Sequence, residues 1–113
     1  MSDFEFLDYK GSKEMVIKYT PKYTVRNCPA GNAPFSGMLQ IVYKPRKRLL
    51  EFGSFELWLK EHIAQQELLI EDVAEIVYDA LVEVLQPDYL TLTLTADTIV
   101  HATVTINIDT NHN

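Results

Sequence analysis

The only cysteine of the chain lies in a stretch rich in Pro, Gly and Asn, residues 26–34. A thiol on a loop can reach a ligand, whereas a thiol inside an apolar run usually serves packing. A nucleophilic cysteine needs a lowered pKa, and a nearby cation can supply it. Arg26, two residues before Cys28, is such a cation. Cys28 is therefore a candidate nucleophile, and a small half-buried turn residue is the alternative.

Two further groups could contact a ligand. Glu71 and Asp72 are expected in the first turn of a helix, where the helix dipole favours carboxylates, and this is the structural explanation of Glu71. Residues 44–48 place four cations in five positions, including Arg46, Lys47 and Arg48. This basic run is a candidate phosphate contact, to a nucleotide or a nucleic acid, or simply a solvated loop.

Composition narrows the class of protein. The chain has 113 residues, 47% hydrophobic and 23% charged, which is typical of one globular domain. A net charge of −6 argues against a protein that coats nucleic acid, and a single cysteine excludes an internal disulfide. No run is apolar enough for a membrane helix, and the N-terminus has no signal peptide pattern. We expect a soluble, cytoplasmic protein.

The spacing of the apolar residues predicts the helices and strands. We expect a loosely attached arm over residues 1–13, strands over 14–19 and 36–44, and helices over 50–62 and 69–85. The first helix has an apolar stripe of Phe52, Phe55, Leu59 and Ile63, and the second has one of Val73, Ile76, Val77, Ala80, Leu81 and Val84.

The last third of the chain alternates most clearly. Residues 89–95 and 98–109 read as an antiparallel hairpin joined by Ala96 and Asp97, with a threonine face that is either solvated or lines an interface or a barrel. The order ββααββ predicts an α+β fold, a four-stranded antiparallel sheet with both helices on one face. This single domain would span residues 14–109, with a tail at 110–113.

Several short motifs together resemble the QueF family, whose members have the tunnelling fold and act on 7-cyano-7-deazaguanine. The Cys-Pro motif of the family is similar to Cys28-Pro29 with Pro34, Tyr43 and Pro45 further on. The reductase signature of the family falls on residues 51–58, which begin with Glu51 and include Ser54. Its substrate-binding glutamate matches Glu71, and 86–90 resembles the Pro-x-Tyr entry to the third strand. The resemblance covers residues 15–108.

The departures from the family pattern are specific. Phe35 stands where the family has its catalytic aspartate, and Ile70 replaces the histidine before the glutamate. Gly53 and Glu56 replace two lysines that the reductases associate with NADPH, and a carboxylate repels cofactor phosphates. The resemblance therefore implies the NADPH-independent, archaeosine-type branch, in which Cys28 forms a thioimide with the nitrile and an amidine follows.

Three alternatives stay open. One is an NADPH-dependent reductase of queuosine synthesis, the second a non-catalytic protein that binds a purine or pterin, and the third a purely structural oligomer. Without the aspartate, the proton donor would be another group, and His62 is one candidate. A zinc enzyme is disfavoured because Cys28, His62, His101 and His112 lack ligand spacing.

The resemblance also implies partners. Glu71, Glu51 and Ser54 would bind the base, no metal or cofactor is needed, and tRNA or DNA carrying the base is an open substrate class. Tunnelling-fold domains assemble into rings, so we expect a homo-oligomer with sites between subunits.

Overall fold

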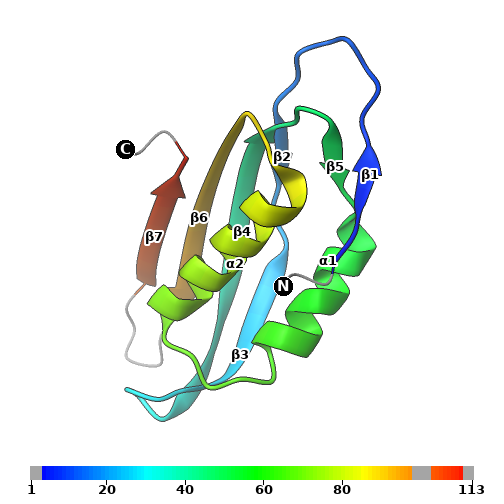
Figure 1. The fold of residues 1–113 in the computed structure, drawn as a ribbon. Coiled ribbons are helices and arrows are strands. Elements are labelled where there is room, and N and C mark those ends of the chain that lie inside the picture. The colour runs from blue at the N-terminus through cyan, green and yellow to red at the C-terminus, as the bar shows by residue number, and fades with distance from the viewer. Residues whose placement is uncertain (1–3, 98–102, 111–113) are drawn as a thin grey trace.

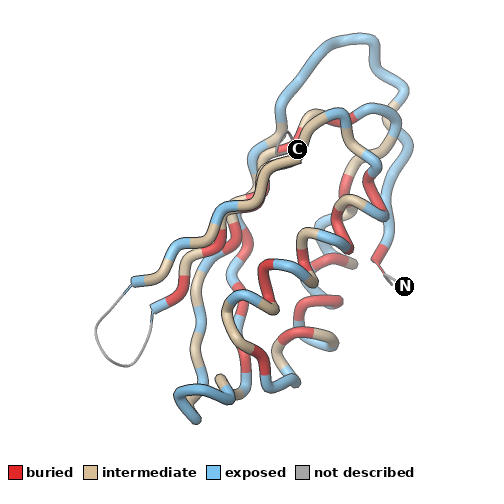
Figure 2. The backbone as a smooth tube through the Cα atoms, turned by 60° about the vertical axis from the view of Figure 1, so that its left-hand side comes forward, coloured by how far each residue is buried: buried red, intermediate tan, exposed pale blue. Residues whose placement is uncertain are grey.

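The structure is a computed structural model that describes residues 4–97 and 103–110. It has two layers: an antiparallel β-sheet, and two helical segments that both lie on one face of it (Figure 1; Figure 2). The α+β class is confirmed, and the order of elements is compatible with the predicted ββααββ arrangement. The described main sheet has five strands where we predict four, because its first strand is divided in two, and two further short strands form a separate small sheet. None of the described helices is long and apolar enough to cross a membrane.

The first edge of the sheet is a strand broken into two parts. β2 (Ile17–Tyr19) and β3 (Lys22–Cys28) both pair with the long strand β4 (Ala33–Lys44). Pro21 separates them, since proline cannot donate to the ladder, but the strand resumes directly after it. The sequence patterns predict no strand between residues 20 and 35, and this prediction is wrong.

The stretch around Cys28 is a hairpin turn. Cys28 is the last residue of β3 and stands opposite Ala33, the first of β4. Asn32 has a φ of 52°, in the left-handed region that Asn tolerates, and its N–H donates to the carbonyl of Cys28 at 2.6 Å. Residues 29–32 alone form the turn, so the loop is shorter than the sequence suggested.

The C-terminal hairpin exists, but its turn is displaced. β6 (Tyr89–Asp97) continues through Ala96 and Asp97, which pair with Val104 and Thr103 of β7 (Thr103–Asp109). The predicted two-residue connection was therefore wrong. Ala96 is buried and extends the alternation of Leu90, Leu92 and Leu94, which explains the longer strand. Residues 98–102, among them Val100 and Ala102 of the predicted apolar face, lie outside the described residues.

Both predicted helices are present with changed boundaries. α1 (Phe52–Trp58) continues as a π-helix, η1 (Leu59–Ile63), and α2 spans Ile70–Leu85. The stripe of α2 is confirmed, with Ile76 only half-buried. In the first stripe Phe55, Leu59 and Ile63 are buried, while Phe52 is 44% exposed and packs on Tyr19.

The N-terminal segment is attached to the domain. β1 (Phe6–Asp8) pairs with β5 (Arg48–Leu50) in a small second sheet. The ring of Phe4 is buried edge-on against Phe55 and Trp58, with centroids 5.0 and 5.2 Å apart. Residues 4–8 thus differ from the loose arm expected, because Phe4 completes an aromatic cluster.

The core lies between the sheet and the helices. Alternate residues of β4 and β6 point toward α1, η1 and α2 and are fully buried, namely Leu39, Ile41, Tyr43, Leu90, Leu92 and Leu94. The residues in between form the other face of the sheet. Thr91, Thr93 and Thr95 on that face are half-buried, and none of the described helices covers them (Figure 2).

Candidate functional site

Cys28 is displayed at one tip of the molecule. Its side chain is half-buried and its thiol is free of disulfide bonding. The turn that follows it protrudes below the end of the sheet, at the same end as the start of α2 (Figure 1). A thiol in this position is open to a ligand from the solvent side.

Glu71 is the second residue of α2 and is exposed. The helix start is closed by Asp72, whose carboxylate accepts the N–H of Leu69 at 3.1 Å. Of the two carboxylates in the first turn, Glu71 and Asp72, it is thus Asp72 that caps the helix. This leaves the side chain of Glu71 directed at solvent, where it can accept hydrogen bonds from a ligand.

One backbone contact brings these two residues to the same end of the fold. The N–H of Leu68 donates to the carbonyl of Asn27 at 3.0 Å, and Asn27 and Glu67 form an isolated parallel bridge. The linker between η1 and α2 is thereby fixed beside the residue that precedes Cys28. Glu71 follows Leu68 by three positions.

Glu51 and Ser54 have structural partners. The carboxylate of Glu51 accepts the N–H groups of Gly53 and Ser54, each at 2.9 Å, and caps α1. These two hydrogen bonds hold the pKa of Glu51 below its ordinary range. The hydroxyl of Ser54 donates to the carbonyl of Glu51 and accepts the N–H of Glu5 at 2.9 Å. Both residues lie at the far end of α1 from the cysteine turn (Figure 1).

The basic run is largely paired within the chain. Lys44 bonds Glu14 at 2.9 Å, and Arg46 bonds Asp88 at 2.7 Å. Arg48 donates to the carbonyl of Val84 at 2.9 Å, near the end of α2, and its guanidinium lies over the ring of Phe6. Arg48 therefore joins β5 to α2, while Arg46 and Lys47 are both exposed.

β4 separates the basic run from Cys28. A strand of 12 residues spans roughly 40 Å, and the two features stand at its opposite ends. One chain does not bring Arg46, Lys47 or Arg48 to the thiol.

His62 lies in η1 between the helices. Its ring stacks on Trp58 at 5.6 Å, and its carbonyl accepts the side-chain amide of Gln66. Together with Asp79 and Glu83 of α2 it lines a hollow of about 330 Å³. The ring thus faces α2, and the hollow does not include Cys28.

Two of the residues that depart from the family pattern, Phe35 and Ile70, are packing residues. Phe35 pairs with Val25 across the hairpin and packs edge-on against Tyr23 at 6.2 Å. Ile70 is half-buried against the core. Glu56 accepts the hydroxyl of Tyr19 at 2.5 Å. Burial of the ring, together with this hydrogen bond, raises the pKa of Tyr19 well above its ordinary value.

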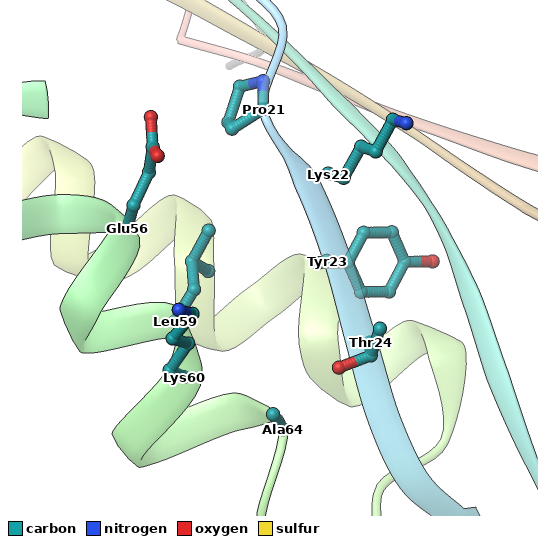
Figure 3. A pocket seen from close by; sticks show the side chains of 8 residues that line it. All are labelled: Pro21, Lys22, Tyr23, Thr24, Glu56, Leu59, Lys60 and Ala64. Atoms are coloured by element: carbon teal, nitrogen blue, oxygen red, sulfur yellow. The ribbon is translucent and has the colours of Figure 1, made fainter. Parts of the chain in front are cut away.

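A groove of about 370 Å³ runs between β3 and the helical segment α1–η1 (Figure 3). Its lining residues come from both walls and comprise Pro21, Lys22, Tyr23, Thr24, Glu56, Leu59, Lys60 and Ala64. None of the candidate site residues is among them. Within residues 4–97 and 103–110, no three His, Cys, Asp or Glu side chains are grouped as a metal site would need. His101 and His112 lie outside these ranges.

Sequence patterns did not identify Glu67 or Asn27 as functional residues. Glu67 accepts hydrogen bonds from Arg26 at 3.1 Å and from Asn27 at 3.2 Å. Forty residues separate Asn27 from Glu67, and no periodicity reports such a contact. Arg26, expected to act on the thiol, instead forms an ion pair with Glu67.

The class of fold is thus an antiparallel sheet with two helical segments on one face, and the candidate site is the turn at Cys28 with the start of α2. A scan against known protein-family models finds no match. No curated protein matches the chain significantly.

Proposed function

We propose that the protein is a QueF-like enzyme that binds 7-cyano-7-deazaguanine and converts its nitrile to an amidine without NADPH. The observation that supports this most is the contact between Asn27 and Leu68, because it holds Cys28 and Glu71 at one end of the domain. A thiol and a carboxylate in that arrangement suit a nitrile and the N–H edge of a base.

The proposed reaction has two steps. The thiolate of Cys28 attacks the nitrile carbon, a carbon–sulfur bond forms, and the nitrile nitrogen takes up a proton to give a thioimide. Ammonia, the co-reactant, then adds to the same carbon, the carbon–sulfur bond breaks, and the thiolate leaves. One nitrile and one ammonia thus give one amidine, with no change of oxidation state.

We propose a reaction without NADPH because of two residues of α1, Gly53 and Glu56. Gly53 offers no side chain, and Glu56 presents a carboxylate that already accepts the Tyr19 hydroxyl. A negative charge there disfavours the phosphates of a dinucleotide.

The complete site is proposed to lie between copies of the chain in a ring. The sheet ends on β2 and β3 at one side and on β7 at the other, so each chain presents an edge strand at both ends of its described sheet. Pairing of one edge with the other edge of a neighbour would be a heterologous contact, which closes into a ring when the rotation fits. It would also let Glu51, Ser54, His62 or the basic run of another chain approach Cys28.

The test is incubation of the full chain with 7-cyano-7-deazaguanine, followed by intact mass and absorbance. We expect a covalent adduct that is absent in Cys28→Ala and strongly reduced in Glu71→Gln. Ammonium should then release an amidine, whereas release of an amine only with NADPH would establish the reductase instead. No Cys28-dependent adduct in any condition would overturn both.

A non-catalytic base-binding protein is the second candidate. Phe35 favours it, since an aromatic ring packed on Tyr23 fills the position where the family keeps its acid. This alternative predicts a tight complex with an unreacted thiol, unchanged in Cys28→Ala.

The free base is the substrate that we favour over tRNA or DNA, because most cations of the basic run are paired within the chain. A binding titration with tRNA and DNA at two salt concentrations distinguishes these classes. Strong binding that salt abolishes would assign the nucleic acid as substrate.

A further inference from the structure

We infer that Glu67 is a positioning residue, which fixes the turn that carries Cys28 against the linker that leads into the helix of Glu71. The inference rests on the proposed function for its role in a reaction. Its physical basis is the pair of hydrogen bonds that the Glu67 carboxylate accepts from the last residues of β3.

The carboxylate of Glu67 uses both of its oxygens on β3. Oε2 accepts Nη2 of Arg26 at 3.1 Å, and Oε1 accepts Nδ2 of Asn27 at 3.2 Å. Two donors from consecutive residues define the direction of a strand end more tightly than one contact does. The backbone bond from Leu68 to Asn27 adds a third attachment at the next position of the linker.

The attachment reaches the turn itself. Nδ2 of Asn27 also lies 3.5 Å from Oδ1 of Asn32, and the N–H of Asn32 closes the turn onto the carbonyl of Cys28. Glu67, Asn27 and Asn32 therefore form a continuous set of polar contacts around the backbone of Cys28. Movement of the linker would move the thiol.

The ion pair in this set is exposed to solvent. Its loss should therefore change the position of the turn more than the free energy of unfolding. The side chains of Arg26 and Glu67 are 60% and 53% exposed, and an ion pair in water contributes little to folding. A reacting pair, in contrast, is sensitive to small displacements, since a misplacement of about 1 Å can slow a reaction about a hundredfold. Removal of Glu67 should thus affect geometry far more than unfolding.

The experiment compares Glu67→Ala and Glu67→Gln with Glu14→Ala, in the full chain. Glu14 is a matched control, because its carboxylate makes another surface ion pair, with Lys44 at 2.9 Å, at the other end of β4. Hydrogen exchange is the first measurement and needs no ligand. Glu67→Ala should accelerate exchange about tenfold in the peptides that contain Asn32 and Leu68, and Glu14→Ala should leave both unchanged.

The second measurement compares two reactions of Cys28. Adduct formation with 7-cyano-7-deazaguanine should fall about tenfold or more in Glu67→Ala, while alkylation by iodoacetamide, which needs no alignment, should stay within about twofold of wild type. Glu67→Gln keeps one acceptor oxygen for Asn27 and should recover part of the adduct rate.

The outcomes separate the two proposals. If wild type forms no adduct, the proposed function fails, and hydrogen exchange still decides whether Glu67 couples the two segments. Unchanged exchange in both peptides, or an equal loss of both thiol reactions, would overturn the positioning role.

Discussion

The phenol oxygen of Tyr43 accepts the backbone N–H of Leu50 at 3.0 Å, in a part of the molecule where both residues are buried. Tyr43 belongs to the central strand β4, and Leu50 ends β5, which pairs with β1. A single side chain thus joins the main sheet to the small N-terminal sheet. Burial raises the pKa of Tyr43 above its ordinary value of 10.0, so the phenol is neutral at about pH 7.

Tyr43→Phe should therefore destabilise the fold. The change leaves the N–H of Leu50 buried without its acceptor, at a cost of about 1–3 kcal/mol. Urea unfolding measures this difference. Tyr9→Phe is the control, since that hydroxyl donates to the carbonyl of Lys13 at an exposed site and its loss should cost about 0.5 kcal/mol or less. Equal losses in the two variants would refute the role of the buried bond.

Phe4→Ala should be more costly still. Phe4 is 5% exposed and packs edge-on against Phe55 and Trp58, so truncation leaves a cavity and should lower stability by about 3–5 kcal/mol. Leu7→Ala, at a position that is 53% exposed, should change it by about 0.5 kcal/mol or less. If both variants unfold at the same urea concentration as wild type, the N-terminal segment is loosely attached after all.

Gly37→Ala should weaken the pairing of β4 with β6. A Cβ atom at this position would lie 1.7 Å from the carbonyl oxygen of Thr95, so the backbone would have to move. That oxygen also accepts the hydroxyl of Tyr23 at 3.1 Å, and Tyr23 stands opposite Gly37 in the sheet. We expect a loss of about 1–3 kcal/mol in thermal or urea unfolding.

Gly31→Ala is the matched control for that experiment. An added Cβ at Gly31 meets no atom within 4 Å, and its φ is not positive. The exchange of Gly for Ala there should be neutral or slightly stabilising, because it restricts the unfolded chain. A Gly37→Ala variant as stable as Gly31→Ala would contradict the close approach of the two strands.

The N-cap of α1 should make stability depend on pH in acid. The N–H groups of Gly53 and Ser54 hold the pKa of Glu51 below its ordinary value of 4.5. A carboxyl whose pKa is lowered by folding stabilises the fold fully above the unfolded value and loses this effect as pH falls through the folded value. Glu51→Gln should thus be less stable than wild type at about pH 7, and the difference should shrink toward about pH 3. A difference that grows on acidification would show that the charge is not what caps the helix.

Periodicity predicted those parts of the fold in which one face is buried. The apolar stripe of α2 and the alternation from Leu90 to Leu94 predicted a helix and a strand, because burial selects the same residue types that produce the pattern. The sequence did not predict β3, since Arg26 and Asn27 at its end make it look like part of a loop. Their side chains are turned to Glu67, a contact across 40 residues or more that local composition cannot report.

The residue types of the candidate site could be predicted from the sequence. The hydrogen bonds and ion pairs that these residues make could not. Cys28 and Glu71 stand where a turn and a helix start display them. Glu51 and the cations of the basic run were candidates because they are charged, yet the fold uses Glu51 as a cap and Arg46 as a partner of Asp88. Sequence patterns show that a charge is present and do not show whether the chain has already paired it.

The π-helix η1 has a consequence for insertions and deletions. The N–H of Ala64 bonds the carbonyl of Leu59, five residues back, so this turn contains one residue more than an α-helical turn would. Removal of one residue among Leu59–Ile63 would convert this turn to α-helical spacing while the segments on both sides of it stay in phase. Glu67 would then keep its place beside β3, whereas removal of one residue from the middle of α2 would rotate everything beyond it by about 100°. A library of single-residue deletions should therefore find Leu59–Ile63 more tolerant than the middle of α2.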